Sequence, residues 1–306
     1  MTAESRRTAG EPIAHTPTPR RNGPLRTSRL RVLDIETRVI EGGPGESAEA
    51  VLLLHGNPGS AEDWAFVQAS LAGFARVIAF DLPGYGKADR PHTWEYSPAS
   101  YAAFIEAAIE ELGVERAHLV MHDLGGLALV WAANHPEQLA SAVLIDTGNL
   151  VNFRWHALAR LYRTPVVGEL LVALTIRPLF TAAFARLNPQ SRRLPTAVID
   201  RMWGEYDRGT RRAAMRFYRA TPAEAMGLLA PLLRPLDCPA LVIWGRHDPF
   251  IPVAQSDHQR ESFPSAEVVV FDDSGHWPHI DNPQRATAEI AAFLERQLVL
   301  RTRTHN

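Results

Sequence analysis

The sequence predicts an α/β fold in which a mostly parallel central sheet is flanked by helices and interrupted by an inserted helical cap. Three observations support this prediction. Short apolar runs alternate with helical patterns over residues 28–147, only helical patterns follow over residues 148–236, and the alternation resumes over residues 237–306. Strands that alternate with helices form parallel sheets that are covered on both faces. We therefore assign 28–147 and 237–306 to one core and 148–236 to the cap.

The expected core elements follow one another in a regular order along the chain. Residues 29–43 predict an N-terminal hairpin. Continuous apolar runs predict buried strands, and longer segments with helical periodicity predict helices. Strands are expected at 50–56, 75–81, 117–123, 140–146, 238–245 and 266–272, and helices at 60–72, 98–113, 125–135, 252–262 and 283–298.

Length and charge restrict the classes of function. The chain has 306 residues, of which 46% are hydrophobic, and this suffices for one large domain with an insertion or for two smaller domains. Its 32 basic and 34 acidic residues give a formal net charge of −2 without a long like-charge block. This balance argues against a nucleic-acid partner and favours a small organic substrate, apolar or moderately polar, together with water. It leaves the oligomeric state open.

The N-terminal tail and the single cysteine give no sign of secretion. Residues 1–27 are rich in Pro, Arg and Thr and lack the apolar stretch of a secretory signal, so we expect a disordered tail. No apolar run reaches the ~18 residues of a membrane-spanning helix, so we expect a cytoplasmic protein without a membrane span. Cys238 precedes the apolar run "PALVIWG" and is expected in the core rather than in a redox site.

Three chemically active residues are expected at the carboxyl ends of strands. Asp123 ends the segment "HLVMHD", Asp248 ends "VIWGRHD", and His276 ends "VVVFDDSGH". The carboxyl ends of parallel strands meet at one edge of a sheet, where such sheets bind their ligands. The order of a nucleophile, an acid and a histidine base, with separations of 125 and 28 residues, is that of hydrolases whose nucleophile stands on a strand-to-helix turn.

Five short motifs extend this pattern along the chain. They are "HGNPG" (55–59), "DLPGYG" (81–86), "HDLGG" (122–126), "GRHDPFIP" (245–252) and "SGHWPH" (274–279). With these motifs in this order, residues 29–298 resemble the α/β-hydrolase fold superfamily, in the branch that uses an aspartate nucleophile. The resemblance implies that no cofactor or metal is needed.

The resemblance also implies roles for individual residues. Asp123 is the expected nucleophile, His276 the base, and Asp248 the acid that orients the base, while Asp146 at the end of the preceding strand is the alternative acid. The backbone N–H groups of Asn57 and Leu124 are the expected oxyanion hole. The competing interpretations are that Asp123 is only a turn residue and that another histidine is the base. Those histidines are His55, His122, His247 and His279.

A carboxylate nucleophile restricts the reaction. On an acyl substrate it would give an anhydride, which is a poor intermediate, whereas at a saturated carbon with a leaving group it gives an alkyl ester of Asp123. Water deprotonated by His276 would then attack the carbonyl carbon of this ester, with Asp248 stabilising the positive imidazole. The expected substrate is therefore an epoxide or an alkyl halide.

The leaving group separates two families that the chain resembles. Haloalkane dehalogenases bind halide through the side chain of an Asn in "HGNP", here Asn57, and through a Trp after the nucleophile, but that position here is Leu124. Epoxide hydrolases polarise the epoxide with cap tyrosines, and the segment "RFYRATP" resembles theirs at Tyr218, with Tyr162 as a second candidate. The alternative role of these tyrosines is packing. Two cap tryptophans could donate an indole N–H instead, namely Trp155 and Trp203.

The absence of a Trp after the nucleophile decides the prediction. A buried halide ion without hydrogen-bond donors costs several kcal/mol of free energy. We expect an epoxide hydrolase, with a haloalkane dehalogenase as the alternative. A non-catalytic binding protein on a hydrolase scaffold is the lesser alternative, and the complete set of acid, base and nucleophile argues against it.

Overall fold

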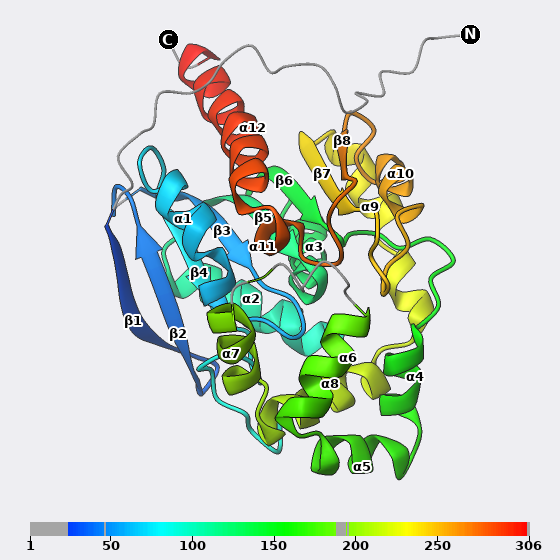
Figure 1. Ribbon diagram of the computed structural model, residues 1–306. Helices are drawn as coiled ribbons and strands as arrows, with labels where there is room; N and C mark the ends of the chain where they lie inside the picture. The colour runs from blue at the N-terminus through cyan, green and yellow to red at the C-terminus, as the bar shows by residue number, and fades with distance from the viewer. Residues whose placement is uncertain (1–23, 46, 188–193, 195, 305–306) are drawn as a thin grey trace, which may run out of the picture.

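The computed structural model describes residues 24–45, 47–187, 194 and 196–304. These residues form one eight-stranded sheet in the order β1-β2-β4-β3-β5-β6-β7-β8 (Figure 1). β2 is antiparallel to both of its neighbours, and the other neighbouring pairs are parallel. The predicted α/β fold with a mostly parallel sheet is confirmed. The strands are β1 (Leu25–Val32), β2 (Ile35–Gly42), β3 (Glu49–Leu54), β4 (Val77–Phe80), β5 (Arg116–His122), β6 (Leu139–Ile145), β7 (Ala240–Gly245) and β8 (Glu267–Phe271).

The first strand begins earlier in the chain than expected. We expected disorder over residues 1–27, but β1 begins at Leu25 and pairs with β2 along its full length, from Leu25 opposite Gly42 to Val32 opposite Ile35. Backbone pairing with the sheet therefore orders three residues whose composition gave no strand signal. The prediction for residues 1–23 lies outside the described residues.

Helices cover both faces of the sheet. Alternate residues of β3 divide between two apolar clusters: Leu52 and Leu54 pack toward α2 and α3, whereas Val51 and Leu53 pack toward α1 and α12. Fully buried strands of this kind explain the continuous apolar runs in the sequence. The core helices are α1 (Ala65–Leu71), α2 (Pro98–Glu111), α3 (Ala128–Asn134), α10 (Gln255–His258), α11 (Pro278–Asp281) and α12 (Pro283–Thr304).

The chain between β6 and β7 contains helices and no strand among its described residues. We call residues 148–236 the cap. Most of its helices gather at one end of the sheet, away from the C-terminal end of α12, whereas the last of them lies near β7 and β8 (Figure 1). They are α4 (Ala157–Arg163), α5 (Val167–Leu174), α6 (Arg177–Leu187), α7 (Thr196–Glu205), α8 (Arg208–Ala220) and α9 (Ala230–Leu233).

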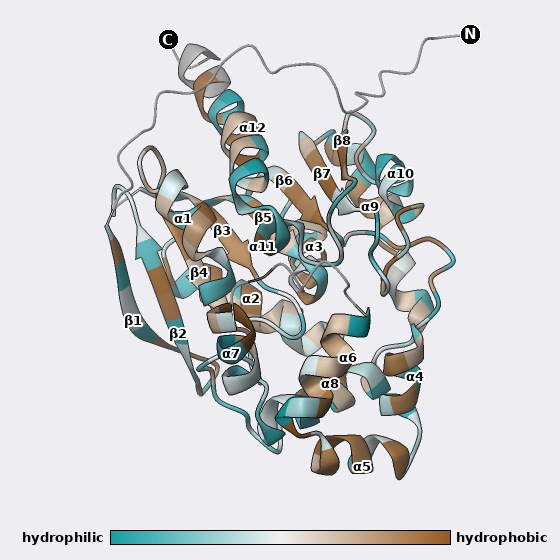
Figure 2. Cartoon of the chain, in the orientation of Figure 1, coloured by the Kyte–Doolittle hydropathy of each residue, from teal (hydrophilic) through white to brown (hydrophobic). Residues whose placement is uncertain are grey.

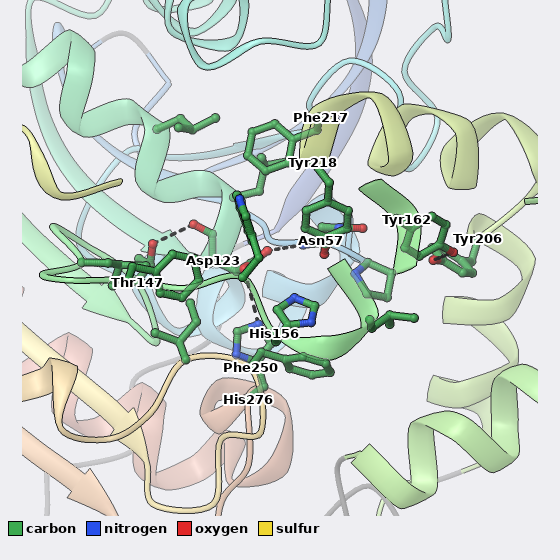
Figure 3. A pocket seen from close by; sticks show the side chains of 18 residues that line it. Asn57, Asp123, Thr147, His156, Tyr162, Tyr206, Phe217, Tyr218, Phe250 and His276 are labelled. Atoms are coloured by element: carbon green, nitrogen blue, oxygen red, sulfur yellow. Dashed lines mark hydrogen bonds and ion pairs between the residues drawn. The ribbon is translucent and has the colours of Figure 1, made fainter. Parts of the chain in front are cut away.

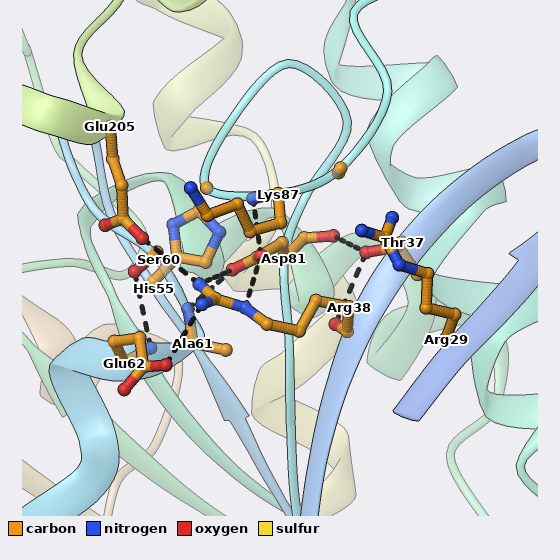
Figure 4. A network of polar contacts seen from close by, with 12 residues as sticks. Arg29, Thr37, Arg38, His55, Ser60, Ala61, Glu62, Asp81, Lys87 and Glu205 are labelled. Atoms are coloured by element: carbon orange, nitrogen blue, oxygen red, sulfur yellow. Dashed lines mark hydrogen bonds and ion pairs between the residues drawn. The ribbon is translucent and has the colours of Figure 1, made fainter. Parts of the chain in front are cut away.

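Ion pairs join the core to α7 of the cap (Figure 4). We call this group the core–cap seam, formed by Arg38, Asp63, Asp81, Arg201 and Glu205. Arg38 of β2 donates to both carboxylate oxygens of the fully buried Asp81, at 2.9 and 3.2 Å, and also contacts Glu205 of the cap at 3.3 Å. Arg201 of α7 donates to the carboxylate of Asp63 in the core and to the hydroxyl of Ser60. A charge that is buried in this way needs its partners, so the seam fixes α7 against the core.

Candidate active site

The backbone turns sharply where β5 ends. Asp123 follows the last residue of β5, has a φ of +45°, and begins a 3-10 turn over Asp123–Leu127. The turn packs so closely on β3 that a Cβ on Gly125 would lie 2.3 Å from the carbonyl oxygen of Leu54. A left-handed aspartate costs on the order of 1–3 kcal/mol and is kept only where its surroundings enforce it. This corner directs the carboxylate of Asp123 into a cavity under the cap (Figure 3).

The loops after β7 and β8 bring Asp248 and His276 to the same corner. The Nδ1 of His276 lies 2.7 Å from Oδ2 of Asp248, and its Nε2 lies 3.5 Å from Oδ2 of Asp123. The other oxygen of Asp248 accepts the backbone N–H groups of Phe250 and Ile251 at 2.7 and 3.0 Å. The three residues expected from the motif order are therefore brought together, with the imidazole between two carboxylates.

Charge interactions set the protonation of this group. Burial raises the pKa of Asp123, but the hydrogen bond and charge of His276 outweigh it and lower that pKa to about 2. Burial lowers the pKa of His276, but Asp248 and Asp123 outweigh it and raise that pKa well above its usual value. At neutral pH the resting site accordingly holds an Asp123 carboxylate beside a positive imidazole.

Asp146, the alternative acid, lies next to this group but does not pair with His276. Its Oδ1 accepts the backbone N–H of Gly245 at 3.0 Å, and its buried Oδ2 has no hydrogen-bond partner among the described residues. Oxygens of Asp146 and Asp248 lie within 4.8 Å of each other and of a nitrogen of His276. Burial and the charge of Asp248 raise the pKa of Asp146 well above its usual value, which favours the protonated form of this carboxyl group.

The other histidines have different environments. His122 is fully buried, and burial together with the charge of His276 lowers its pKa to about 3. Its neutral ring places Nε2 2.7 Å from the backbone carbonyl oxygen of His276, which it holds in position by donating a hydrogen bond. His55 bridges the carbonyl of Gly56 and the N–H of Leu82, at 2.8 and 2.9 Å. The ring of His279 stacks on that of Trp64, and His247 is exposed.

Asn57 connects Asp123 to the cap. Its backbone N–H donates to Oδ1 of Asp123 at 2.7 Å, and its side-chain Nδ2 donates to the hydroxyl of Tyr218 in α8 at 3.0 Å. Burial and the charge of Asp123 raise the pKa of Tyr218 well above 10, so the phenol keeps its proton. Because the phenol oxygen accepts from Asn57, its own O–H remains available to a bound molecule.

The cavity above Asp123 measures about 60 Å³ and is mostly apolar. For comparison, an engineered apolar cavity of about 150 Å³ holds benzene. The cap must therefore move before this smaller cavity can hold a ligand of the size of benzene or larger. Core residues form the floor and cap residues form the roof (Figure 3). The lining residues are Asn57, Pro58, Asp123, Leu124, Leu127, Thr147, Leu150, Phe153, Trp155, His156, Leu158, Tyr162, Tyr206, Phe217, Tyr218, Phe250, Ile251 and His276.

Comparison with known proteins identifies the family. A model of the alpha/beta hydrolase fold matches residues 49–283, which is more than half of the chain. The chain belongs to the alpha/beta hydrolase fold family. A 2-hydroxy-6-oxononadienedioate/2-hydroxy-6-oxononatrienedioate hydrolase of Burkholderia vietnamiensis is 29% identical over 276 residues, which cover 85% of this chain and 92% of that protein.

Solved structures of two other hydrolases have the same fold. A haloalkane dehalogenase from Bradyrhizobium elkani superposes with a TM-score of 0.78 at 22% identity, over 90% of this chain and 100% of that chain. An epoxide hydrolase superposes with a TM-score of 0.75 at 18% identity, over 89% and 99% of the two chains. At this level of identity the likeness describes the fold and leaves the reaction to the residues of the site.

Two residues of this alpha/beta hydrolase site were missed by the sequence analysis. His156 lines the cavity, and its Nδ1 accepts the backbone N–H of Ala159 at the start of α4, at 3.2 Å. Burial lowers the pKa of His156 to about 4, so the ring is neutral and carries its hydrogen on Nε2. Tyr206 places its hydroxyl 2.8 Å from that of Tyr162, and both rings line the cavity. The only sequence signal for His156 was its position directly before a helical pattern, where a helix-capping residue is expected.

The two candidate tryptophans do not offer a free indole N–H to the cavity of this hydrolase. Trp155 lines the cavity, but its Nε1 donates to the carbonyl of Thr221 at 3.1 Å. Trp203 is not among the lining residues and packs against Phe180. Cys238 is buried as expected, and burial raises the pKa of its thiol to about 12.

Proposed function

We propose that this protein is a hydrolase that forms an alkyl ester on Asp123, and that its substrate is an epoxide. The observation that carries the proposal is the pair of groups on opposite sides of one cavity. An ionised carboxylate lies on the floor at Asp123, and a neutral phenol with an available O–H lies in the roof at Tyr218. An epoxide needs both a nucleophile at carbon and an acidic hydrogen at oxygen.

In the first step, Oδ2 of Asp123 forms a bond to one carbon of the epoxide. The bond from this carbon to the ring oxygen breaks, and its electron pair stays on the oxygen. Tyr218 stabilises this oxygen with a hydrogen bond from its O–H, and His156 supplies a second hydrogen bond from Nε2–H. Positioned donors of this type act strongly in a cavity that excludes water. Tyr162, our second candidate from the sequence, has its hydroxyl beside that of Tyr206 and contributes to the roof.

In the second step, a water molecule loses a proton to His276 and its oxygen attacks the ester carbonyl carbon of Asp123. Negative charge develops on Oδ1, which the backbone N–H of Asn57 already contacts at 2.7 Å. The N–H of Leu124 remains the second donor that we assign to this oxyanion hole. Collapse of the intermediate expels the ester oxygen as an alkoxide, which receives the proton held by His276. Asp123 is left as a carboxylic acid, and its proton passes to His276, which restores the resting carboxylate and positive imidazole. The net change is epoxide plus water to vicinal diol.

Formation of the ester also prepares His276 for its role. In the resting site the imidazole lies between two carboxylates, which raise its pKa. Alkylation turns Asp123 into a neutral ester and removes one of those charges, so the pKa of His276 falls. The imidazole then loses its proton to the alkoxide and becomes able to accept one from water. Asp248 remains as the carboxylate that orients the ring, at 2.7 Å from Nδ1.

Carbonyl chemistry is less suited to this site. The relative from Burkholderia vietnamiensis is named as a hydrolase of 2-hydroxy-6-oxononadienedioate, which offers carbonyl carbons. Many alpha/beta hydrolases carry serine at the corner where Asp123 stands. A carboxylate that attacks an acyl carbon yields an anhydride rather than a stable ester, so we do not transfer the activity of that relative to this chain.

Dehalogenation is the second candidate, and the position of Asn57 favours it. The side-chain amide of Asn57 lies beside Asp123, where a departing halide would need an N–H donor. Against it, Leu124 has no side-chain donor and the indole N–H of Trp155 is already bonded within the cap. A departing halide ion also needs no proton, which leaves the O–H of Tyr218 without a function.

The covalent intermediate provides the test. Replacing His276 by Gln leaves Asp123 able to attack but removes the base, so the alkyl ester should accumulate. Mass spectrometry of a proteolytic digest after exposure to styrene oxide should show the substrate mass added to the peptide that contains Asp123. His247→Gln, at an exposed histidine, is the matched control and should turn over without an adduct. If neither styrene oxide nor 1-bromobutane labels the His276→Gln variant, the alkyl-ester mechanism is wrong.

A further inference from the structure

The outer side of the cap presents a concentrated apolar surface. More than half of the exposed large apolar side chains of the described residues lie within residues 161–179, on α4, α5 and the turn into α6. Figure 2 shows α5 as a strongly hydrophobic helix at the edge of the molecule. Surfaces of this kind mark sites of interaction with proteins or membranes. We call it the apolar cap face, formed by Leu161, Val166, Leu170, Leu174, Ile176 and Leu179, which are 46–68% exposed.

Helix α5 is apolar on both of its sides. Gly168 and Val172 are buried against the cap, while Leu170 and Leu174 are exposed. Its single charged side chain, Glu169, is neutralised by Arg219 of α8, whose guanidinium donates to both carboxylate oxygens. A helix that is apolar all round normally lies in a protein interior or in lipid. Since one side of α5 already packs on the cap, its other side is suited to lipid.

The geometry of α5 and α6 fits the membrane surface rather than its interior. No described helix is by itself long and apolar enough to cross a membrane, whereas α5 and Arg177–Arg186 of α6 together reach that length and composition. The two helices are bent by 113° relative to each other, so they do not form a continuous span. Short apolar helices with basic neighbours lie in the plane of the lipid interface.

The charge of the cap is opposite to that of the core. Residues 148–236 contain 14 arginines, no lysine and five acidic residues, a formal charge of +9, whereas the rest of the chain carries −11. Arg160 lies in the last turn of α4, and Arg177 begins α6, where it also pairs with Asp200. Both are exposed beside the apolar cap face. Basic residues beside an apolar surface are attracted to anionic lipids at about 1 kcal/mol each.

We propose that the apolar cap face docks onto an anionic lipid surface, with leucines of α5 and of the start of α6 inserted among the acyl chains and the arginines at the headgroups. Charge argues against a second copy as the occupant. A two-fold dimer through this face would bring two caps of charge +9 together, and that repulsion opposes association. The same charge attracts a surface of phosphatidylglycerol. The acidic core would face away from the membrane.

Vesicle co-sedimentation of the full chain tests the proposal. The protein should pellet with vesicles of phosphatidylcholine and phosphatidylglycerol, pellet much less with phosphatidylcholine alone, and dissociate as salt is added. The variant Leu170→Ser/Leu174→Ser/Leu179→Ser should bind at least about tenfold more weakly, since three inserted side chains are lost. None of the three leucines lines the cavity, so turnover of a water-soluble substrate should be unchanged and shows that the variant is folded.

The control variant is Leu33→Ser/Phe66→Ser, which changes two exposed apolar residues of the core and should bind as the wild type does. The proposal is overturned if the triple variant binds vesicles as tightly as the wild type, or if the wild type does not pellet with phosphatidylglycerol. It is also overturned if sedimentation equilibrium finds a dimer that the triple variant dissociates while no vesicle binding is seen. That result would assign the face to a second copy.

Discussion

Tyr218→Phe is the substitution that separates the two candidate reactions. It removes one O–H from the cavity roof and leaves the aromatic packing intact. Loss of one donor to a developing oxyanion lowers kcat by about 10²–10³-fold, or ~2.7–4 kcal/mol. His156 still donates to the same oxygen in our mechanism, so we expect a value near the lower end of this range. The amide of Asn57 also loses its partner, which lowers the free energy of unfolding by about 1 kcal/mol.

The assay is diol formation from an epoxide, with halide release from a bromoalkane measured in parallel. Tyr218→Phe should depress kcat/KM for the epoxide and leave any halide release little changed, because a halide departs without a proton. Tyr96→Phe is the matched control, since the hydroxyl of Tyr96 donates to the carbonyl of Pro91 and does not line the cavity. Equal kcat/KM for the two variants on the epoxide would refute the role of Tyr218.

Three further predictions concern the charged groups. The pKa of the His276 imidazole, measured by NMR, should be lower in Asp123→Asn than in the wild type, because the amide mimics the neutral ester; an unchanged or higher value contradicts the mechanism. Asp146→Asn should retain most activity, since Asp146 accepts the backbone N–H of Gly245 and does not pair with His276, whereas Asp248→Asn should lose about 10⁴-fold in kcat; a reversed order would make Asp146 the acid. Asp81→Asn should lower the free energy of unfolding by about 3–5 kcal/mol in urea titrations, and a loss below ~1 kcal/mol would show that the seam pairs are weak.

The core of the fold was predictable because its strands are buried on both faces. A short continuous apolar run such as that of β3 indicates a strand that is buried on both faces. The structure places this strand at Glu49–Leu54, and the sequence predicted it at 50–56. Strand β1 shows where this signal fails. Most of its side chains are exposed, so its residues carry no apolar run, and its first residues are fixed by hydrogen bonds to β2. Such pairing is a property of two segments and is not encoded in either one alone.

The sequence predicted the placement of the floor residues and only part of the roof. Asp123, Asp248 and His276 follow strands of one parallel sheet, so their strand order already brings them to one edge. His156 and Tyr206 reach the cavity through the packing of cap helices against one another, which depends on contacts among many side chains. The sequence identifies each only as a residue near a helix end. Tyr218 was predicted from the resemblance of its segment to that of epoxide hydrolases. The structure places it on the cavity wall, and its role stays a prediction.

The core–cap seam also bears on how a molecule reaches the cavity. Two kinds of contact hold the cap closed. Aromatic rings of the cap pack on rings of the core, as Phe217 does on Tyr101 and His156 on Phe250, and Arg201 and Glu205 of α7 form ion pairs with the core. Separating the roof from the floor exposes apolar area to water, whereas separating an ion pair gives each charge a new hydration shell. Opening the seam transfers charges that the closed cap holds buried into water, where dissolved salt screens them and stabilises the open form. The rate at which a large substrate enters should consequently rise with ionic strength, whereas the chemistry at Asp123, enclosed by the cavity, should not respond to it.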